Sequence, residues 1–170
     1  PDLQDALETI MPSPENQTAF LENVQKALQS EPNNGVAWAY VATIYRMQGK
    51  PEQALEAATK AITLLRAKPA RRAMVYSLRS DIYSDLEDAV KALMDLHSAI
   101  KDAPDTPQLY SKRGGLYLNM EQYDLAEVDL RKSISLAPKD ATGYTGLATI
   151  AILQERYEDA IQNLNDAVKL

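Results

Sequence analysis

Residues 38–62 read WAYVATIYRMQGKPEQALEAATKAI, and the same pattern of residue types recurs three more times. The later copies are YSLRSDIYSDLEDAVKALMDLHSAI at 76–100, YSKRGGLYLNMEQYDLAEVDLRKSI at 110–134 and YTGLATIAILQERYEDAIQNLNDAV at 144–168. All four copies align without a gap. Their starting points lie 38, 34 and 34 residues apart, which indicates a 34-residue unit with one four-residue insertion near 67–70.

Each copy carries two stripes of apolar and small residues at helical spacing. The first stripe opens on an aromatic residue and has a small residue four positions later, on the same helical face. These pairs are Trp38 and Ala42, Tyr76 and Ser80, Tyr110 and Gly114, and Tyr144 and Ala148. The second stripe continues in steps of four and three from Ala54, Ala92, Ala126 or Ala160. The pattern predicts two amphipathic helices of about 14 residues per unit, with small residues where their axes come close.

Breaks in the pattern predict where the helices end. A short polar segment follows each first helix and contains Gly49, Asp88, Gln122 or Arg156. The second helices are stopped by Pro32, Pro104 and Pro138. Residues 1–34 follow the same register less fully, with a short helix expected after Asp2. No Gly-, Ser- or Pro-rich linker separates these parts, so we expect a single domain.

The motif W-x2-V-A-x2-Y followed by A-x3-A-x2-A, and the motif Y-x2-R-G-x2-Y followed by A-x3-L-x2-S and Pro138, resemble the tetratricopeptide repeat. The resemblance covers essentially the whole chain. It departs from the family pattern at Arg66, where a proline is usual, and at Ala151, where a second aromatic residue is usual.

This resemblance implies an all-α fold, a right-handed superhelical solenoid of antiparallel helical hairpins. The expected units are a degenerate leading repeat (1–34), a repeat with the insertion (35–72), two full repeats (73–106 and 107–140) and a truncated last repeat (141–170), which together form one solenoid domain.

The resemblance also implies that the first helices line a concave groove, whose surface consists of first-helix positions outside the packing stripe. Small, apolar and hydrogen-bonding residues are mixed at these positions, which suits an extended or helical peptide. The candidate groove residues are Tyr40, Thr43, Arg46, Met47, Ser77, Asp81, Asp85, Gln108, Lys112 and Asn119.

Several of these residues also have a plainer interpretation. Tyr40 serves no repeat position and is a candidate binding anchor, but it could also pack against the leading unit. Arg46 and Met47 are either groove contacts or the solvated end of a helix. Asp81 and Asp85 lie four residues apart on one helical face, where they could accept a basic partner residue or simply face water.

A cluster of cations lies near the insertion and consists of Arg66, Lys68, Arg71 and Arg72. The segment 35–72 has a formal charge of +5, and the segments on either side of it have −5 and −4. The cluster is a candidate docking patch for an acidic partner. The alternative is charge complementarity between adjacent units, together with the preference of cations for a helix C-terminus.

Charge and composition argue against several classes of function. With a formal charge of −6, the chain is a poor match for nucleic acid, whose binding needs a surplus of Lys and Arg. It has no Cys, and its only His, His97, has no metal-ligand spacing around it, so we expect no catalysis, no metal and no cofactor. The sequence contains no run of about 18 apolar residues, so it does not predict a membrane span. The compartment stays open between a soluble cytoplasmic and a bacterial periplasmic location.

We therefore expect a protein–protein interaction scaffold with a protein or peptide partner, and not an enzyme. The alternative is a self-assembly module, or an accessory arm of a larger chain that carries a separate catalytic domain. The last unit ends inside its second helix and leaves an apolar face uncovered at Ile161, Leu164, Val168 and Leu170. This predicts either that the native chain continues or that two copies pack end to end as a homodimer.

Overall fold

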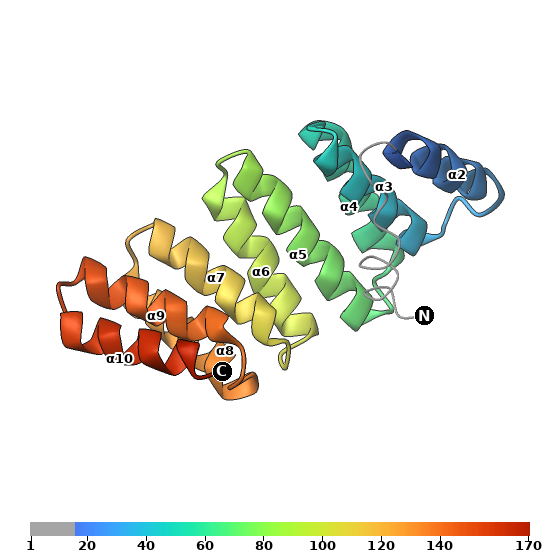
Figure 1. Ribbon diagram of the computed structural model, residues 1–170. Coiled ribbons are helices and arrows are strands. Elements are labelled where there is room, and N and C mark those ends of the chain that lie inside the picture. The colour runs from blue at the N-terminus through green and yellow to red at the C-terminus, as the bar shows by residue number, and fades with distance from the viewer. Residues whose placement is uncertain (1–15) are drawn as a thin grey trace. The chain divides into compact units, whose positions relative to one another are not determined.

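The computed structural model describes residues 16–170, and within this range it consists of α-helices without a β-strand (Figure 1). The helices are α2 (Gln17–Ser30), α3 (Gly35–Met47), α4 (Pro51–Leu64), α5 (Pro69–Asp85), α6 (Ala89–Asp102), α7 (Pro107–Asn119), α8 (Tyr123–Leu136), α9 (Ala141–Leu153) and α10 (Tyr157–Val168). The all-α fold class is confirmed. The short helix expected after Asp2 lies outside the described residues.

The chain divides into two compact units between Asp102 and Ala103. In the first unit α3 pairs with α4 and α5 pairs with α6, while α2 packs on α3 and α4 packs on α5. In the second unit α7 pairs with α8, α9 pairs with α10, and α8 packs on α9. Each unit is therefore a short stack of helical hairpins, in which a second helix lies against the first helix of the next hairpin (Figure 1).

Small residues lie where the paired helices come closest, as the sequence predicted. In the first unit Ala42 and Ala54 are completely buried, and Ser80 is 1% exposed. In the second unit a Cβ atom added at Gly114 would lie 3.0 Å from Leu130 Cγ, which leaves no room for a larger residue without a shift. The short distance between helix axes is therefore built into the sequence at one position per hairpin.

The turn inside each hairpin has one residue in the left-handed region. These residues are Gly49 (φ 67°), Glu87 (φ 59°), Glu121 (φ 59°) and Glu155 (φ 58°). In the first of these turns the N–H of Gly49 donates to Arg46 O at 3.0 Å and the N–H of Lys50 donates to Tyr45 O at 2.9 Å, which is the Schellman pattern of a helix end. Asp88, Gln122 and Arg156 lie in the breaks between helices, as predicted, and the residue in the left-handed region is the glutamate before each of them.

The four-residue insertion lengthens a helix instead of a loop. Helix α5 has 17 residues, whereas α3, α7 and α9 have 13 each. Pro69 stands in the first turn of α5, where its missing N–H costs no hydrogen bond. The expected repeat boundary between residues 72 and 73 therefore falls inside α5, since a periodic pattern does not show where a helix gains an extra turn.

The opening aromatic residues are tied to the chain six residues before them. Trp38 Nε1 donates to Pro32 O at 2.9 Å, the Tyr110 hydroxyl donates to Pro104 O at 2.8 Å, and the Tyr144 hydroxyl donates to Pro138 O at 3.3 Å. The insertion places Ala70 instead of a proline six residues before Tyr76. This hydrogen bond is therefore present in the hairpins whose preceding helix is followed by a proline.

Candidate functional site

The predicted groove residues of the first unit include an ion-pair network that joins α3 to α5. Arg46 Nε donates to Asp85 Oδ2 at 2.6 Å, and Arg46 Nη2 donates to Asp85 Oδ1 at 3.3 Å. Arg46 Nη1 lies 3.7 Å from Asp81 Oδ2. The hydrogen bond to Asp85 and the nearby carboxylate of Asp81 raise the pKa of Arg46. Asp85 thus already pairs with a cation of the neighbouring hairpin. The sequence had suggested either a basic residue of a partner or exposure to water, and not this pair.

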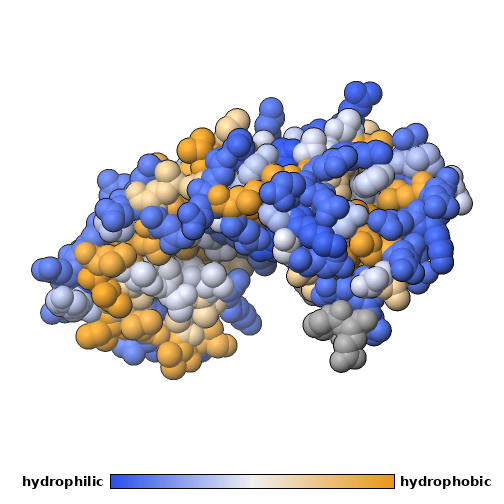
Figure 2. All heavy atoms as spheres, turned by 90° about the horizontal axis from the view of Figure 1, so that it is seen from above, coloured by the Kyte–Doolittle hydropathy of each residue, from blue (hydrophilic) through white to orange (hydrophobic). Residues whose placement is uncertain are grey.

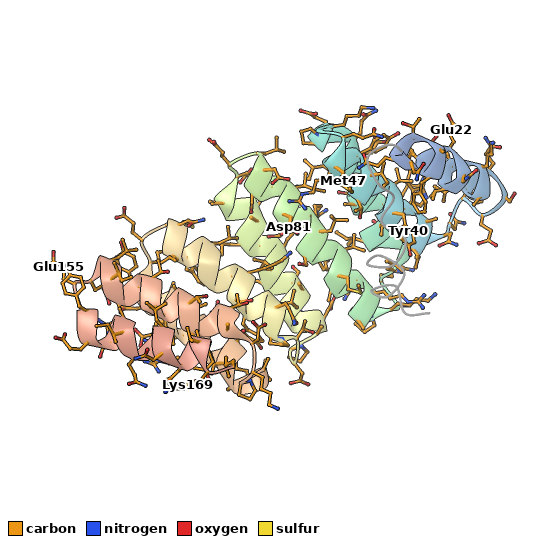
Figure 3. All side chains as sticks on the ribbon, in the orientation of Figure 1. Glu22, Tyr40, Met47, Asp81, Glu155 and Lys169 are labelled. Atoms are coloured by element: carbon orange, nitrogen blue, oxygen red, sulfur yellow. The ribbon has the colours of Figure 1, made fainter. Side chains whose placement is uncertain are left out.

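Tyr40 lies on α3 and packs against the leading helix (Figure 3). Its ring meets the ring of Phe20 on α2 edge to face, with 5.8 Å between the ring centroids and 70° between the ring planes. Burial raises the pKa of the Tyr40 hydroxyl. The packing role is therefore observed, and Tyr40 remains half-buried with part of its ring on a cavity described below.

The other predicted groove residues differ in how much surface they offer. Thr43 is only 8% exposed, and its hydroxyl donates to Ala39 O of the same helix at 3.0 Å, so it offers almost no surface. Met47 is 46% exposed and Ser77 is half-buried. In the second unit Gln108, Lys112 and Asn119 are exposed, and their spacing of four and seven residues places them on one face of α7.

A cavity of about 750 Å³ lies in the first unit where α2 ends, α3 begins, α4 ends and α5 begins. It brings Tyr40 together with Lys68 and Arg71, which the sequence assigned to separate sites. The lining residues are Val24, Ala27, Glu31, Pro32, Asn33, Asn34, Gly35, Val36, Ala37, Tyr40, Leu64, Leu65, Lys68 and Arg71. One predicted groove residue, Tyr40, and two of the four cations of the predicted basic patch therefore line the same cavity.

The four cations of the predicted patch have different environments. Arg72 Nε and Nη2 each lie 2.6 Å from a carboxylate oxygen of Asp102, whose side chain is 8% exposed, and Arg72 Nη1 donates to Arg66 O at 3.2 Å. This bidentate pair ties the start of α5 to the end of α6 and raises the pKa of Arg72. In contrast, Arg66, Lys68 and Arg71 are exposed and form no ion pair with a described residue. Arg72 therefore stabilises the α5–α6 hairpin, and the other three side chains of the predicted patch stay exposed.

A repeated buried ion pair was not predicted from the sequence. Arg79 Nε and Nη2 each lie 2.8 Å from an oxygen of Asp95, and the two side chains are 17% and 6% exposed. Arg113 pairs with Asp129 in the same way at 2.7 and 2.8 Å. In both hairpins the hydrogen bond to the aspartate raises the pKa of the arginine. The signal in the sequence was the recurrence of Arg and Asp after 34 residues at positions next to the packing stripes.

The described residues give no support for a metal site. No group of three or more His, Asp or Glu in residues 16–170 is arranged to hold a metal ion. His97 is exposed on α6, and its Nδ1 lies 2.7 Å from Leu93 O. Within the same part of the chain, no helix is long and apolar enough to cross a membrane.

Two family models described as tetratricopeptide repeat match the chain, one over residues 24–56 and the other over residues 107–140. The chain is a tetratricopeptide repeat protein. One match lies in each unit, so the repeat identity holds on both sides of the division at Asp102. No curated protein sequence matches the chain.

Solved structures share the fold of this tetratricopeptide repeat protein. A crystal structure of MamA is 21% identical with a TM-score of 0.80, covering 99% of this chain and 94% of its own. PilF of Pseudomonas aeruginosa is 20% identical with a TM-score of 0.82, covering 98% and 73%. YrrB, described as a TPR protein with an unusual peptide-binding site, is 18% identical with a TM-score of 0.71, covering 96% and 80%. At these identities the similarity concerns the fold.

Proposed function

We propose that this tetratricopeptide repeat protein is an interaction scaffold that binds an acidic peptide segment of a partner protein in the cavity lined by Tyr40, Lys68 and Arg71. Stacked helical repeats expose extended concave surfaces, and such surfaces serve protein recognition. The similar fold of YrrB, with its peptide-binding site, is consistent with this role. The cavity is the observation that carries the proposal.

The chemistry of the cavity favours a particular kind of peptide. Val24, Val36 and Leu64 provide an apolar wall that an aliphatic or aromatic side chain can cover. Lys68 and Arg71 stand at the same surface without an ion pair to any described residue, and they attract a carboxylate. A peptide with an acidic residue next to an apolar one satisfies both features.

Charge reversal tests this proposal. A library of immobilised peptides is probed with the full chain, and with the double variant Lys68→Glu/Arg71→Glu. Acidic–apolar peptides bind the unchanged chain and lose binding to the variant. The double variant Lys101→Glu/Lys139→Glu changes the net charge equally at exposed positions outside the cavity and retains binding. If both double variants lose peptide binding equally, the effect is due to net charge alone. If neither variant loses binding, the cavity is not the binding site.

A second candidate function is self-assembly through α10. Ile161, Leu164 and Val168 recur at helical spacing and are 60%, 43% and 85% exposed, and Leu170 is 54% exposed. Figure 2 shows hydrophobic residues gathered on the surface of the second unit, at the left of the view. An apolar helix face of this kind suits a second copy of the same helix, related by a twofold axis.

Sedimentation measures this second function directly. A concentration-dependent dimer that dissociates in the variant Ile161→Glu/Val168→Glu supports self-assembly. A strictly monomeric chain at high micromolar concentration removes it. Neither result bears on the cavity of Tyr40, because α10 belongs to the other unit.

A further inference from the structure

One position recurs in each of the four hairpins with different chemistry. It lies between the two helices of each hairpin, and we call this space the guanidinium slot. Its first-helix residues are Val41, Arg79, Arg113 and Leu147, and the facing second-helix residues are Ala57, Asp95, Asp129 and Asn163.

Two of the slots are filled by the chain's own arginine. The guanidinium carbon of Arg79 lies 5.8 and 5.9 Å from the ring centroids of Tyr76 and Tyr83, and Arg79 Nη1 donates to Thr59 Oγ1 at 2.9 Å. The carboxylate of Asp95 accepts two further hydrogen bonds from Arg79. Arg113 lies 5.9 and 6.0 Å from the rings of Tyr110 and Tyr117, opposite Asp129. In both hairpins the guanidinium thus lies between two aromatic side chains and opposite a carboxylate.

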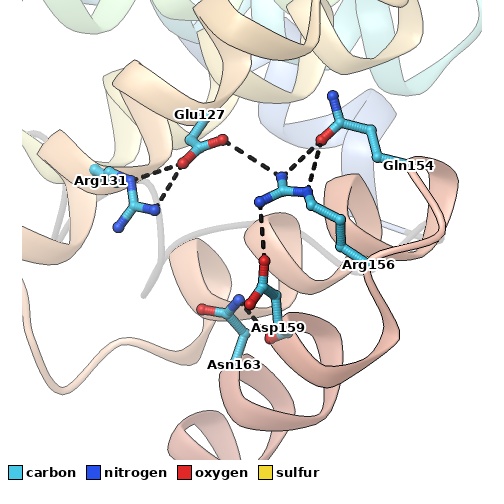
Figure 4. A network of polar contacts seen from close by, with 6 residues as sticks. All are labelled: Glu127, Arg131, Gln154, Arg156, Asp159 and Asn163. Carbon is cyan, nitrogen blue, oxygen red and sulfur yellow. Dashed lines mark hydrogen bonds and ion pairs between the residues drawn. The ribbon is translucent and has the colours of Figure 1, made fainter.

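The slot of the last hairpin is a cavity with an arginine in its lining. Leu147 and Asn163 leave a cavity of about 170 Å³, which Arg156 lines from the turn before α10. Arg156 Nη1 lies 3.0 Å from Asp159 Oδ2, and Arg156 Nη2 lies 3.6 Å from Glu127 Oε2 (Figure 4). Two of the four slots in residues 16–170 therefore hold an arginine paired with a carboxylate, and a third has an arginine in its lining.

The slot of the α3–α4 hairpin is the exception. Val41 and Ala57 replace the arginine and the aspartate, but the two aromatic residues are kept as Trp38 and Tyr45. A cavity of about 370 Å³ remains between α2, α3 and α4. Leu28, Val41 and Ala57 are 7%, 2% and 3% exposed and line it.

Polar groups also line this cavity. Gln25 Nε2 donates to the Tyr45 hydroxyl at 3.3 Å, which leaves the side-chain oxygen of Gln25 as an acceptor. Gln53 and Glu56 line the cavity from α4, and the carboxylate of Glu56 forms no ion pair with a described residue. The aromatic rings and an anion are present, and the guanidinium is absent.

We propose that this cavity binds the side chain of an arginine supplied by a partner protein or peptide. The guanidinium stacks between Trp38 and Tyr45, and its N–H groups donate to Glu56 and to the side-chain oxygen of Gln25. The methylene groups of the arginine cover Val41 and Leu28. The partner thus restores the contacts that Arg79 and Arg113 make within their own hairpins.

Lys60 is compatible with this occupant. Its Nζ lies 3.9 Å from the ring centroid of Trp38, and Lys50 Nζ lies 5.8 Å from that of Tyr45, so both rings already carry an ammonium group. The counterpart of Lys60 in the α7–α8 hairpin is Lys132, whose Nζ lies 5.9 Å from the Tyr110 ring. Arg113 shares that same ring. A lysine at this position and a guanidinium in the slot therefore coexist elsewhere in the chain.

The arginine site is independent of the cavity lined by Tyr40. The described residues that line the two cavities do not overlap. The two cavities also differ in the charge that they offer, because Lys68 and Arg71 attract anions and Glu56 attracts a cation. A partner can therefore use either site without the other, and the two proposals can fail separately.

The test uses Trp38, the only Trp in the chain. The full chain, labelled with ¹⁵N, is titrated with acetyl-Gly-Arg-Gly-amide, and the indole Nε1–H resonance of Trp38 is followed by NMR. The matched probes carry Lys or Leu in place of Arg. We expect a saturable shift in the millimolar range for the arginine peptide, as is usual for so small a ligand, and weaker binding of the other two. A Lys or Leu peptide that binds as tightly, or the lack of a saturable shift with Arg, overturns the proposal.

Two variants locate the binding. Val41→Arg/Ala57→Asp supplies the slot with the pair found at Arg79 and Asp95, and it should abolish the shift because the slot is filled from within. Glu56→Gln changes only an exposed side chain, so the fold is kept, and it should weaken binding about two- to fivefold. Lys68→Glu/Arg71→Glu should leave the titration unchanged. Binding that survives both slot variants at full strength overturns the proposal.

Discussion

The α3–α4 and α5–α6 hairpins of the first unit have the same helical pairing but stabilise it by different means. Val41 and Ala57 line one slot with apolar atoms, whereas Arg79 and Asp95 fill the other with an ion pair. The turn of one hairpin has Gly49 in the left-handed region, and the turn of the other has Glu87. The helical framework therefore does not depend on either solution, and the two hairpins should respond very differently to the same kind of mutation.

Asp95→Ala should have the largest effect on this comparison. It leaves the guanidinium of Arg79, which is 17% exposed, without its carboxylate. Breaking a buried ion pair by removing one partner costs about 3 kcal/mol of unfolding free energy. Urea unfolding followed by circular dichroism measures the loss, and Asp129→Ala should reproduce it in the second unit. A loss below about 1 kcal/mol would show that water solvates the unpaired arginine and that the pair is not effectively buried.

The double variant Arg79→Met/Asp95→Ala sharpens the same comparison. It gives the α5–α6 slot the apolar character of the α3–α4 slot, with similar volume at residue 79. Replacement of a whole buried ion pair by apolar residues is often close to neutral, so we expect a stability within about 1 kcal/mol of the unchanged chain. If the double variant is as unstable as Asp95→Ala alone, the ion pair is needed in its own right and the two slots are not interchangeable.

The turns should give the next largest effect, and with opposite sign. Glu87 holds a φ of 59°, a conformation that an L-residue with a Cβ adopts at a cost, and Gly49 holds nearly the same conformation without that cost. Glu87→Gly should therefore stabilise the chain by about 0.5 to 1 kcal/mol, and Gly49→Ala should destabilise it by about the same amount. Thermal unfolding compares the two variants. Destabilisation by Glu87→Gly would show that the glutamate side chain contributes more than its backbone strain costs.

The repeats could be predicted from the sequence because their signal is local. The spacing from Trp38 to Ala42, and from Ala54 onward, fixes which faces are apolar within a single helix. The structure buries Ala42 and Ala54 completely and Trp38 in part. The Arg79–Asp95 pair was missed for a physical reason. A charged residue beside an apolar stripe normally indicates an exposed position, and only the facing helix shows that the charge is neutralised.

The candidate sites could be predicted only in part. Tyr40 was singled out because it fits no repeat position, but its contact with Phe20 depends on how α2 packs on α3. Arg46 and Asp85 are 39 residues apart, and their pairing depends on the register between two hairpins, which a periodic sequence does not specify. The cavity that joins Tyr40 to Lys68 and Arg71 depends in addition on where α5 begins, and the insertion changed that start.

Asp85→Asn should have the smallest effect, although its hydrogen bond to Arg46 is among the shortest in the first unit at 2.6 Å. Arg46 and Asp85 are 36% and 50% exposed, so water and salt screen the pair, and two long side chains lose freedom to form it. We expect a loss of less than about 0.5 kcal/mol that disappears in 1 M NaCl, whereas the loss from Asp95→Ala persists there. Unfolding at low and high salt separates the two cases. A large, salt-independent loss at Asp85 would mean that the α3–α5 contact is a structural clamp and not a surface ion pair.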